Sequence, residues 1–131
     1  MQYLLLIYGD EAHWAGLSKE ESDAIFDEYR TFTESIAAQG IMQGGAALTP
    51  VSTAHTVRVR DGHATVSDGP FAETREQLGG YYLLDCADLD DAVRWAAKIP
   101  GAQFGSIEVR PVIDYDAVSS TEHANSAAAP N

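Results

Sequence analysis

Acidic side chains gather in one short stretch of the sequence, residues 68–80, which reads DGPFAETREQLGG. Carboxylates that lie close together near a partly dry pocket raise one another's pKa toward values that suit general acid or base catalysis. Asp68 and Glu73 are therefore candidate catalytic groups, with Glu76 nearby. A structural role stays open, because Asp68 can bond its own loop N–H groups while the two glutamates flank a helix cap.

Histidines supply a second set of groups that can act as acid, base or ligand near neutral pH. His13 is a candidate catalytic residue because Asp10 and Glu11 precede it and can orient its ring; an exposed loop histidine is the alternative. His55 and His63 are further candidates. No histidine has a metal-binding spacing such as His-Glu-x-x-His, and the chain has a single cysteine. We therefore expect no metal site and no cofactor.

Aromatic residues predict a cavity for a flat or apolar metabolite with few polar contacts. Tyr8, Trp14, Tyr81 and Tyr82 are the candidate lining residues, and core packing is their alternative role. His55 and Phe71 complete the predicted ligand-binding set. Phe71, between a proline and an alanine, is also expected to pin its loop to the core.

Length and composition limit the classes of function. The 131 residues predict one domain over 1–115, followed by a disordered tail over 116–131 that is rich in Ser, Thr, Ala and Asn. Eight basic and 20 acidic residues give a formal charge of −12, which disfavours direct binding to nucleic acid or anionic membranes. No leader, membrane span or disulfide is indicated, so we expect a cytoplasmic protein.

Periodicity and cap signals predict the elements that must position these groups. Thr74 with Gln77 fits a capping box, which predicts one helical turn over 74–78. Asp61-Gly62 predicts the turn of a hairpin over 56–66. The remaining prediction comprises strands over 2–8, 41–48, 80–86 and 105–113, a connection over 9–17, and helices over 18–40 and 88–98. Without the hairpin this order is two β-α-β units, which predicts a ferredoxin-like α+β sandwich with an inserted β-hairpin.

Local signals add detail to these elements. Ser18 with Glu21 predicts a capping box at the start of the first helix, and Asp88 is expected to cap the second. Gly44-Gly45 predicts a bulge or a close backbone approach in the strand over 41–48. Apolar residues at three- and four-residue steps are expected to face the core, in the first helix Ile25, Phe26, Tyr29, Phe32, Ile36 and Ala37, and in the second Leu89, Ala92, Val93 and Ala96.

Two predicted strands are apolar on both faces. Residues 4–7 read LLLI and residues 81–84 read YYLL, without the alternation of a half-exposed strand. The helices can cover only one face of the sheet, so we expect a second copy to cover the other in a homodimer.

The run Asp68-Gly69-Pro70-Phe71-x-Glu73-Thr74-x-Glu76, with VRVRDG at 57–62 before it and GGYY at 79–82 after it, resembles the DGPF group of the YCII-related family. The resemblance extends over about residues 1–113, a length that suits one domain. It implies a dimeric α/β barrel-type assembly with small-molecule pockets between sheet, loops and helices. No settled reaction comes with it.

Some residues depart from what this resemblance implies. The family is known for a proposed histidine and aspartate pair near the first helix, yet residues 19–39 contain no histidine, so that assignment cannot be carried over. Members of the DGPF group often have an acid after the Gly44-Gly45 pair and a histidine before Gly105, where this chain has Ala46 and Phe104. Either a reaction has been lost or other residues perform it.

Two hypotheses of different classes follow. The first is a small-molecule binder or enzyme with a pocket between the 68–76 loop and the dimeric sheet, in which Asp68 or Glu73 is the base and His13 or His55 assists. The alternative is a non-catalytic accessory protein in sigma-factor-linked transcriptional regulation, because the DGPF group is commonly encoded beside such factors. A vestigial pocket is a third reading.

Overall fold

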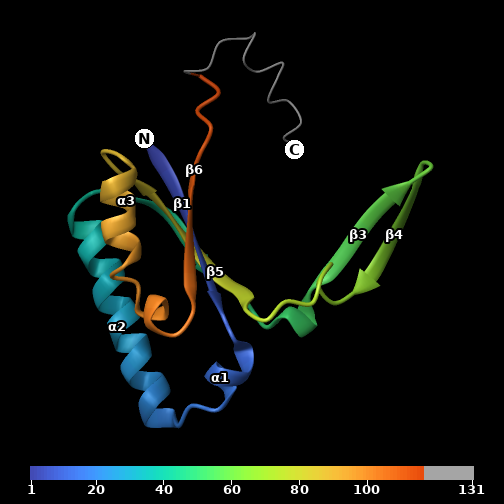
Figure 1. Cartoon of the computed structure of the whole chain (residues 1–131), viewed down its shortest axis with the longest axis horizontal. Coiled ribbons are helices and arrows are strands. Elements are labelled where there is room, and N and C mark those ends of the chain that lie inside the picture. The colour runs from blue at the N-terminus through green and yellow to red at the C-terminus, as the bar shows by residue number, and fades with distance from the viewer. Residues whose placement is uncertain (117–131) are drawn as a thin grey trace.

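A computed structural model describes residues 1–116, which form a mixed α+β structure with antiparallel sheets (Figure 1). One sheet has the strand order β2-β5-β1-β6. Its strands are β1 (Gln2–Gly9), β2 (Met42–Ala47), β5 (Gln77–Asp85) and β6 (Ser106–Pro111). The described part contains three α-helices, α1 (Glu11–Ala15), α2 (Lys19–Ala38) and α3 (Leu89–Ala96). This arrangement is compatible with a ferredoxin-like fold.

Strands β3 (His55–Arg60) and β4 (His63–Asp68) form a separate two-stranded antiparallel sheet that pairs Val57 with Val66. Asp61 and Gly62 make the two-residue turn between these strands. Both have positive φ, as the two central residues of a type I′ turn require. In Figure 1 these strands extend away from the rest of the molecule. We call residues 55–68 the arm and the remainder of the described chain the body. Short 3₁₀ turns at η1 (Val51–Thr53) and η2 (Pro100–Gln103) complete the fold.

The core lies between the four-stranded sheet and helices α2 and α3. Leu5 and Leu84 on the sheet, Ile36 on α2 and Ile99 after α3 are fully buried. Burying each such side chain contributes about 1.5–3 kcal/mol of transfer free energy. Cys86 is also buried, and burial together with nearby aspartates raises the pKa of its thiol. Its reaction with thiol reagents therefore reports on the integrity of the core.

Local capping signals specify where helices α2 and α3 begin. Ser18 accepts a hydrogen bond from the backbone N–H of Glu21, whose carboxylate accepts one from the backbone N–H of Ser18, so the predicted capping box at the start of α2 is confirmed. Asp88 caps α3 through the backbone N–H of Asp91, also as predicted. The irregularity expected in the glycine-containing strand occurs as a register shift between Met42 and Gly44.

The predicted helical turn over 74–78 was wrong. Gln77 begins β5, and its side-chain amide donates to the carbonyl oxygen of Thr74 (2.6 Å), while the Thr74 hydroxyl donates to the carbonyl oxygen of Glu76 (2.6 Å). Both side chains thus bond carbonyl groups, whereas a capping box bonds N–H groups. Pairing of β5 with β1 extends to Gly9 opposite Gln77, and this long-range ladder replaces the local turn.

Three predictions that apolar side chains would be buried in the core were also wrong. Phe71 is 78% exposed and does not anchor its loop, because the chain there is returning from the arm. On α3 only Ala92 and Ala96 are buried, whereas Leu89 and Val93 are about half exposed. Phe26 of α2 is largely exposed. The interval 9–17, expected to be a plain connection, contains α1.

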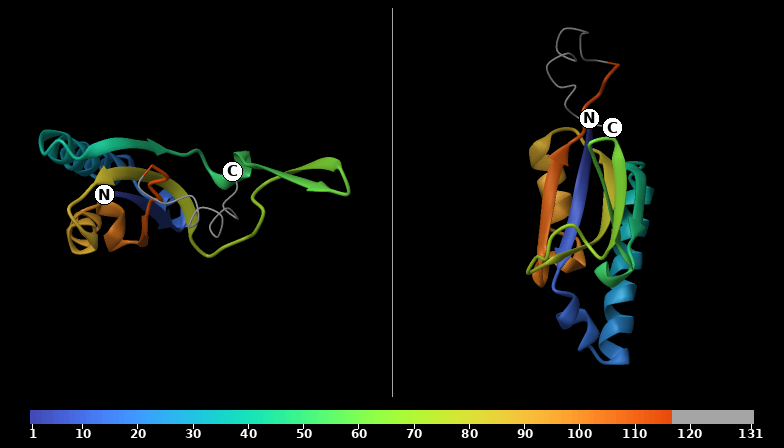
Figure 2. Two further views of the ribbon diagram at one scale, coloured as in Figure 1. Left: turned by 90° about the horizontal axis from the view of Figure 1, so that it is seen from above. Right: turned by 90° about the vertical axis from the view of Figure 1, so that its right-hand side faces the viewer.

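Within residues 1–116, no helix lies on the second face of the sheet. Seen from the side of the arm, the strands stand in front of the helices (Figure 2, right). Strand alternation turns Tyr3 and Leu5 to the helices, where they are buried. Leu4 and Leu6 then point to the other side with their cross-strand partners Leu83 and Tyr81, and all four are partly exposed; we call this set the open face.

No helix within residues 1–116 combines the length and apolar character that a membrane crossing requires. The predicted tail lies outside the described residues, except for Asp116.

Gly105 lies so close to the backbone of β1 that a substitution at this position tests the packing. A Cβ atom at Gly105 would overlap the carbonyl oxygen of Tyr8 and lie 3.0 Å from the Cα of Gly9. Gly105→Ala is expected to lower the free energy of unfolding by about 1–3 kcal/mol in chemical denaturation, because the strand β1 would have to shift.

Gly79→Ala is the matched control, since the nearest atom to its added Cβ lies 3.9 Å away. Both variants reduce the entropy of the unfolded chain equally, so their difference isolates the overlap. Equal stability of the two variants would contradict the packing of Gly105 on β1.

Candidate functional site

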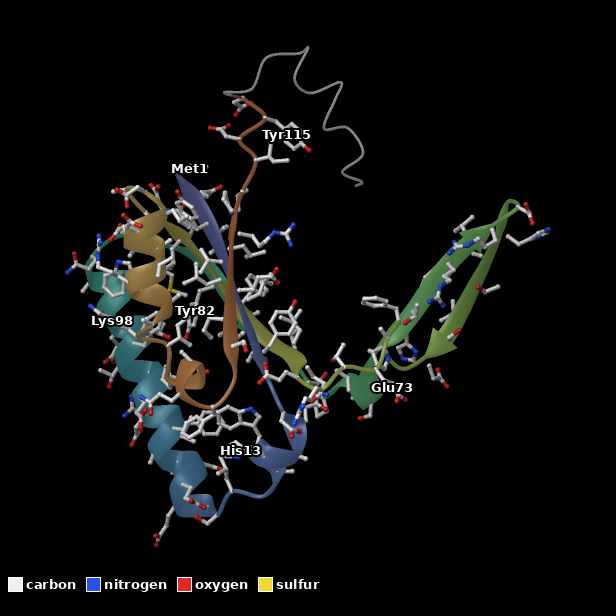
Figure 3. The ribbon with its side chains drawn as sticks, in the orientation of Figure 1. Met1, His13, Glu73, Tyr82, Lys98 and Tyr115 are labelled. Carbon is white, nitrogen blue, oxygen red and sulfur yellow. The ribbon has the colours of Figure 1, made fainter. Side chains whose placement is uncertain are left out.

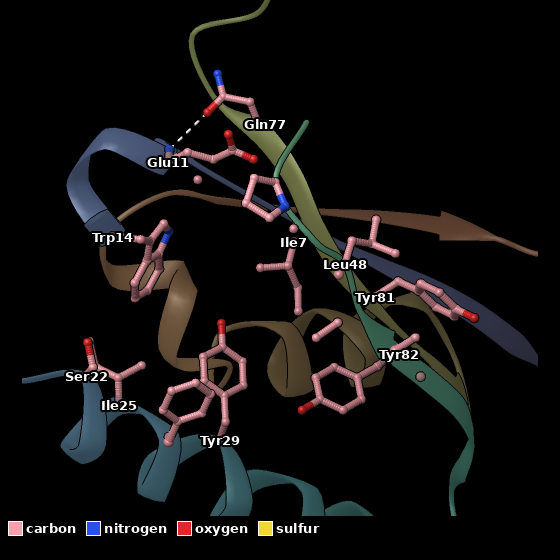
Figure 4. A pocket seen from close by; sticks show the side chains of 18 of the residues that line it. Ile7, Glu11, Trp14, Ser22, Ile25, Tyr29, Leu48, Gln77, Tyr81 and Tyr82 are labelled. Atoms are coloured by element: carbon pink, nitrogen blue, oxygen red, sulfur yellow. Dashed lines mark hydrogen bonds between the residues drawn. The ribbon is translucent and has the colours of Figure 1, made fainter. Parts of the chain in front are cut away.

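A cavity of about 810 Å³ opens between α1, α2 and the sheet, at the end of the sheet near η1 (Figure 4). This volume lies within the range of about 300–1,000 Å³ that is usual for small-molecule sites. Its lining is mainly apolar and aromatic, and includes Ile7, Trp14, Leu17, Ile25, Tyr29, Leu48, Tyr81 and Tyr82. The core fills the space farther along the sheet, so the cavity lies where the N-terminal half of α2 continues beyond the buried residues Phe32 and Ile36.

Two tyrosine hydroxyl groups supply hydrogen-bonding atoms in this cavity. The Tyr29 hydroxyl accepts a hydrogen bond from the backbone N–H of Gly101 (3.1 Å), and the Tyr82 hydroxyl is 2.8 Å from that of Thr33. Burial raises the pKa of Tyr29, so this phenol keeps its proton over the physiological range. Because its oxygen accepts from Gly101, the proton of Tyr29 is available to donate to a ligand.

Glu11 ties three segments together at the rim of the cavity. Its carboxylate accepts from the backbone N–H of Val51 in η1 (2.9 Å), and its own backbone N–H donates to the side-chain carbonyl of Gln77 in β5 (2.9 Å; Figure 4). Asp10 caps α1 by accepting from the backbone N–H of Ala12. These contacts hold α1 in place. This helix has five residues, and none of them is buried.

Trp14 forms one wall of the cavity. Gly9 permits this position, since a Cβ atom there would lie 2.7 Å from the indole nitrogen. On its other side Trp14 meets Phe104 edge-on, with ring centroids 5.9 Å apart. His13 stacks on the same Phe104 at 5.2 Å and is itself exposed. Phe104 thus contacts the rings of both His13 and Trp14.

The structure brings some of the predicted site residues together and separates others. Trp14 and Tyr82 line the cavity, and Tyr81 borders it on β5, where strand alternation turns its side chain to the open face. Tyr8 is partly buried in β1 between two lining residues, Ile7 and Gly9, and alternation therefore points it to the other face of the sheet. His13 and Glu73 lie well apart, beside α1 and beside the arm respectively (Figure 3).

The remaining predicted residues lie at the base of the arm. The Nδ1 atom of His55 is 3.2 Å from a carboxylate oxygen of Asp68, and both side chains are largely exposed. Phe71 and Glu73 follow in the exposed loop after β4. None of these four residues lines the cavity.

Sequence reasoning missed several cavity residues. Tyr29 and Ile25 lie on the apolar stripe of α2 and were predicted only as core. Gln77 was interpreted as a cap, and Glu11 as a partner of His13. Only strand pairing across the chain brings Glu11 and Gln77 together, so no local signal identifies them as rim residues.

Within residues 1–116 no group of three or more His, Cys, Asp or Glu side chains is placed to hold a metal ion. The cavity therefore offers apolar surface, two phenols and one carboxylate at its rim.

Comparison with known proteins agrees with this architecture. The model of the YCII-related domain matches residues 1–116. The chain belongs to the YCII-related family. An uncharacterized protein of Rhizobium meliloti (strain 1021) is 40% identical over 117 residues, which cover 88% of this chain and 94% of that protein. The family match spans every described residue, so arm, body and cavity are all parts of one YCII-related domain.

The rim contacts predict a local effect of removing the Glu11 carboxylate. In Glu11→Ala the backbone N–H of Val51 loses its acceptor, and amide hydrogen exchange there is expected to accelerate about tenfold. Glu20→Ala, which removes an exposed acid from the first turn of α2, is the control and should leave exchange at Val51 unchanged. Unchanged exchange in both variants would refute the role of Glu11 in holding η1.

Proposed function

We propose that this YCII-related protein binds a small, flat, mainly apolar molecule in the cavity between α1, α2 and the sheet. The observation that carries the proposal is the combination of cavity size with an aromatic lining. Trp14, Tyr29 and Tyr82 present ring faces and edges to such a ligand. The protonated phenol of Tyr29 favours a ligand that carries one hydrogen-bond acceptor.

We further propose that a reaction, if the bound molecule undergoes one, uses Asp68 or Glu73 as base with His55 or His13 assisting. The contact between His55 and Asp68 supports this pair, because a carboxylate at this distance can orient an imidazole ring. Both groups lie outside the cavity lining of one chain. Binding and catalysis can therefore be tested separately, through residues of the cavity and of the loop.

The rival function is a non-catalytic accessory role in sigma-factor-linked regulation. The formal charge of −12 favours docking to a basic protein, with encounter rates that fall as salt rises. This role needs no occupied cavity. Salt-sensitive co-purification with a sigma factor, together with an empty cavity, would favour it over ligand binding.

A ligand screen by thermal denaturation tests the proposed cavity. Ile25→Trp, which fills the space next to α2, is expected to abolish the rise in melting temperature that a binding metabolite produces. A ligand at 100 times its dissociation constant stabilises the folded state by about 2.7 kcal/mol, so its loss is easily measured.

Two control variants define the site. Ala24→Trp places the same indole side chain at an exposed neighbouring position outside the lining, and should keep the response. Asp68→Ala should also keep it, because Asp68 lies outside the cavity. Loss of the response in Asp68→Ala, with retention in Ile25→Trp, would place the ligand at the loop and contradict the cavity proposal.

We also propose that the protein acts as a homodimer through the open face. Leu4, Leu6, Tyr81 and Leu83 place adjacent apolar side chains on a sheet surface that no helix covers. Glu108 and Arg110 on β6 form an ion pair at its edge (3.5 Å). An apolar centre with a charged rim is the usual composition of a protein interface.

Substitution of Leu6 by lysine tests this dimer. A charge buried without a partner costs about 3–5 kcal/mol, so Leu6→Lys is expected to give a monomer in size-exclusion chromatography with light scattering. Leu89→Lys makes the same change at a half-exposed position on α3, in the opposite layer, and should remain dimeric. A dimer that survives Leu6→Lys would rule out the open face as its interface.

A further inference from the structure

The arm has two chemically different faces. Val57 and Val59 on β3 alternate with Arg58 and Arg60, and the register places Val66 opposite Val57 on the apolar side. Val57, Val59 and Val66 are 62%, 60% and 66% exposed, so the apolar face is uncovered along its length. Sequence alternation of this kind is typical of a strand pair that is buried on one side.

Within the described chain, the arm contacts the body only at its base. Its strands pair only with each other, and the bonds to adjoining residues are the Gly69 N–H to the carbonyl of Ala54 (2.7 Å) and the Thr56 hydroxyl to the carbonyl of Gly69 (2.9 Å). A two-stranded sheet without a covering layer is at best marginally stable in water. The ordered strands therefore require a surface that the described part of one copy does not provide.

The direction of the arm identifies where that surface lies. Helices α2 and α3 occupy one side of the four-stranded sheet, and the arm extends from the opposite side (Figures 1 and 2). The open face looks toward that same side. A second copy packed on the open face would therefore lie beside the arm of the first copy. The apolar face of each arm would then be available for contact with the other copy.

Charge also favours a second copy as the occupant. The arm carries two arginines, Arg58 and Arg60, against two aspartates, Asp61 and Asp68, and is formally neutral. The rest of the chain carries the whole formal charge of −12. A neutral arm approaches a second acidic body without the repulsion that two bodies exert on each other, and its arginines can pair with acids on that body.

We infer that the arm of one copy packs its valine face against the body of a second copy, so that two copies embrace each other through reciprocal arms. This inference rests on the homodimer proposed above and adds to it a contact outside the open face. In a two-fold dimer the contact occurs twice, because each copy supplies both an arm and a body.

Photo-crosslinking tests the contact directly. The probe p-benzoylphenylalanine replaces Val66 on the apolar face or Thr65 on the polar face in the full-length chain, and the product is mixed with isotope-labelled wild type. Val66→p-benzoylphenylalanine is expected to give crosslinks to body peptides of the labelled copy at least about fivefold more often than the Thr65 variant, because only the valine face is in contact. Crosslinks confined to the same chain, or equal yields from both faces, would overturn the inference.

A triple variant measures the contribution of the arm to the dimer. Val57→Ser, Val59→Ser and Val66→Ser together are expected to raise the dimer dissociation constant at least about tenfold, whereas Arg58→Ser with Thr65→Ser on the polar face changes it less than about threefold. The Cys86 thiol should stay protected in both, which shows that the core is intact.

The outcomes separate this inference from the proposed homodimer. A wild-type protein that is monomeric at every concentration tested refutes both. A dimer that is unchanged by the triple serine variant, and that gives no crosslinks between copies from position 66, refutes the arm contact alone and leaves the open-face dimer in place.

Discussion

The constraint on which the described structure, residues 1–116, depends is that its central sheet is apolar on two faces and has helices on only one of them. β1 and β5 lie side by side at the centre of the sheet. Their helix-facing side chains, among them Leu5 and Leu84, are fully buried, whereas Leu6 and Tyr81 on the other face remain partly exposed. Apolar area left in contact with water is unfavourable in proportion to its size, so the fold of one copy leaves a driving force for association.

The cavity follows from how the helical layer meets the sheet. α2 is long, and its buried residues Phe32 and Ile36 lie in its C-terminal half, so its N-terminal half extends past the packed core. α1 and η1 close this space from the side, held by the two hydrogen bonds of Glu11. The cavity is thus bordered by segments remote in sequence that hydrogen bonds at its rim join to one another.

Elements specified by local signals could be predicted from the sequence, and elements specified by long-range pairing could not. The capping residues Ser18 and Asp88 are sufficient to place both long helices. The cap reading of Thr74 and Gln77 failed because pairing between β5 and β1 outweighs one local turn. At the site, Trp14 and Tyr82 were predictable as candidate aromatic lining residues, but Glu11 and Tyr29 resemble ordinary surface and core residues until the tertiary contacts are known.

The most direct test of the uncovered sheet is hydroxyl-radical footprinting of the wild-type protein over a range of concentrations. The account predicts that Leu6, Tyr81 and Leu83 become protected as concentration rises, while Trp95, which packs among the helices on the other side of the sheet, keeps a constant rate of oxidation. Oxidation of Leu6 and Tyr81 that stays the same at every concentration, in a protein that remains folded, would contradict the claim that a second copy covers this face.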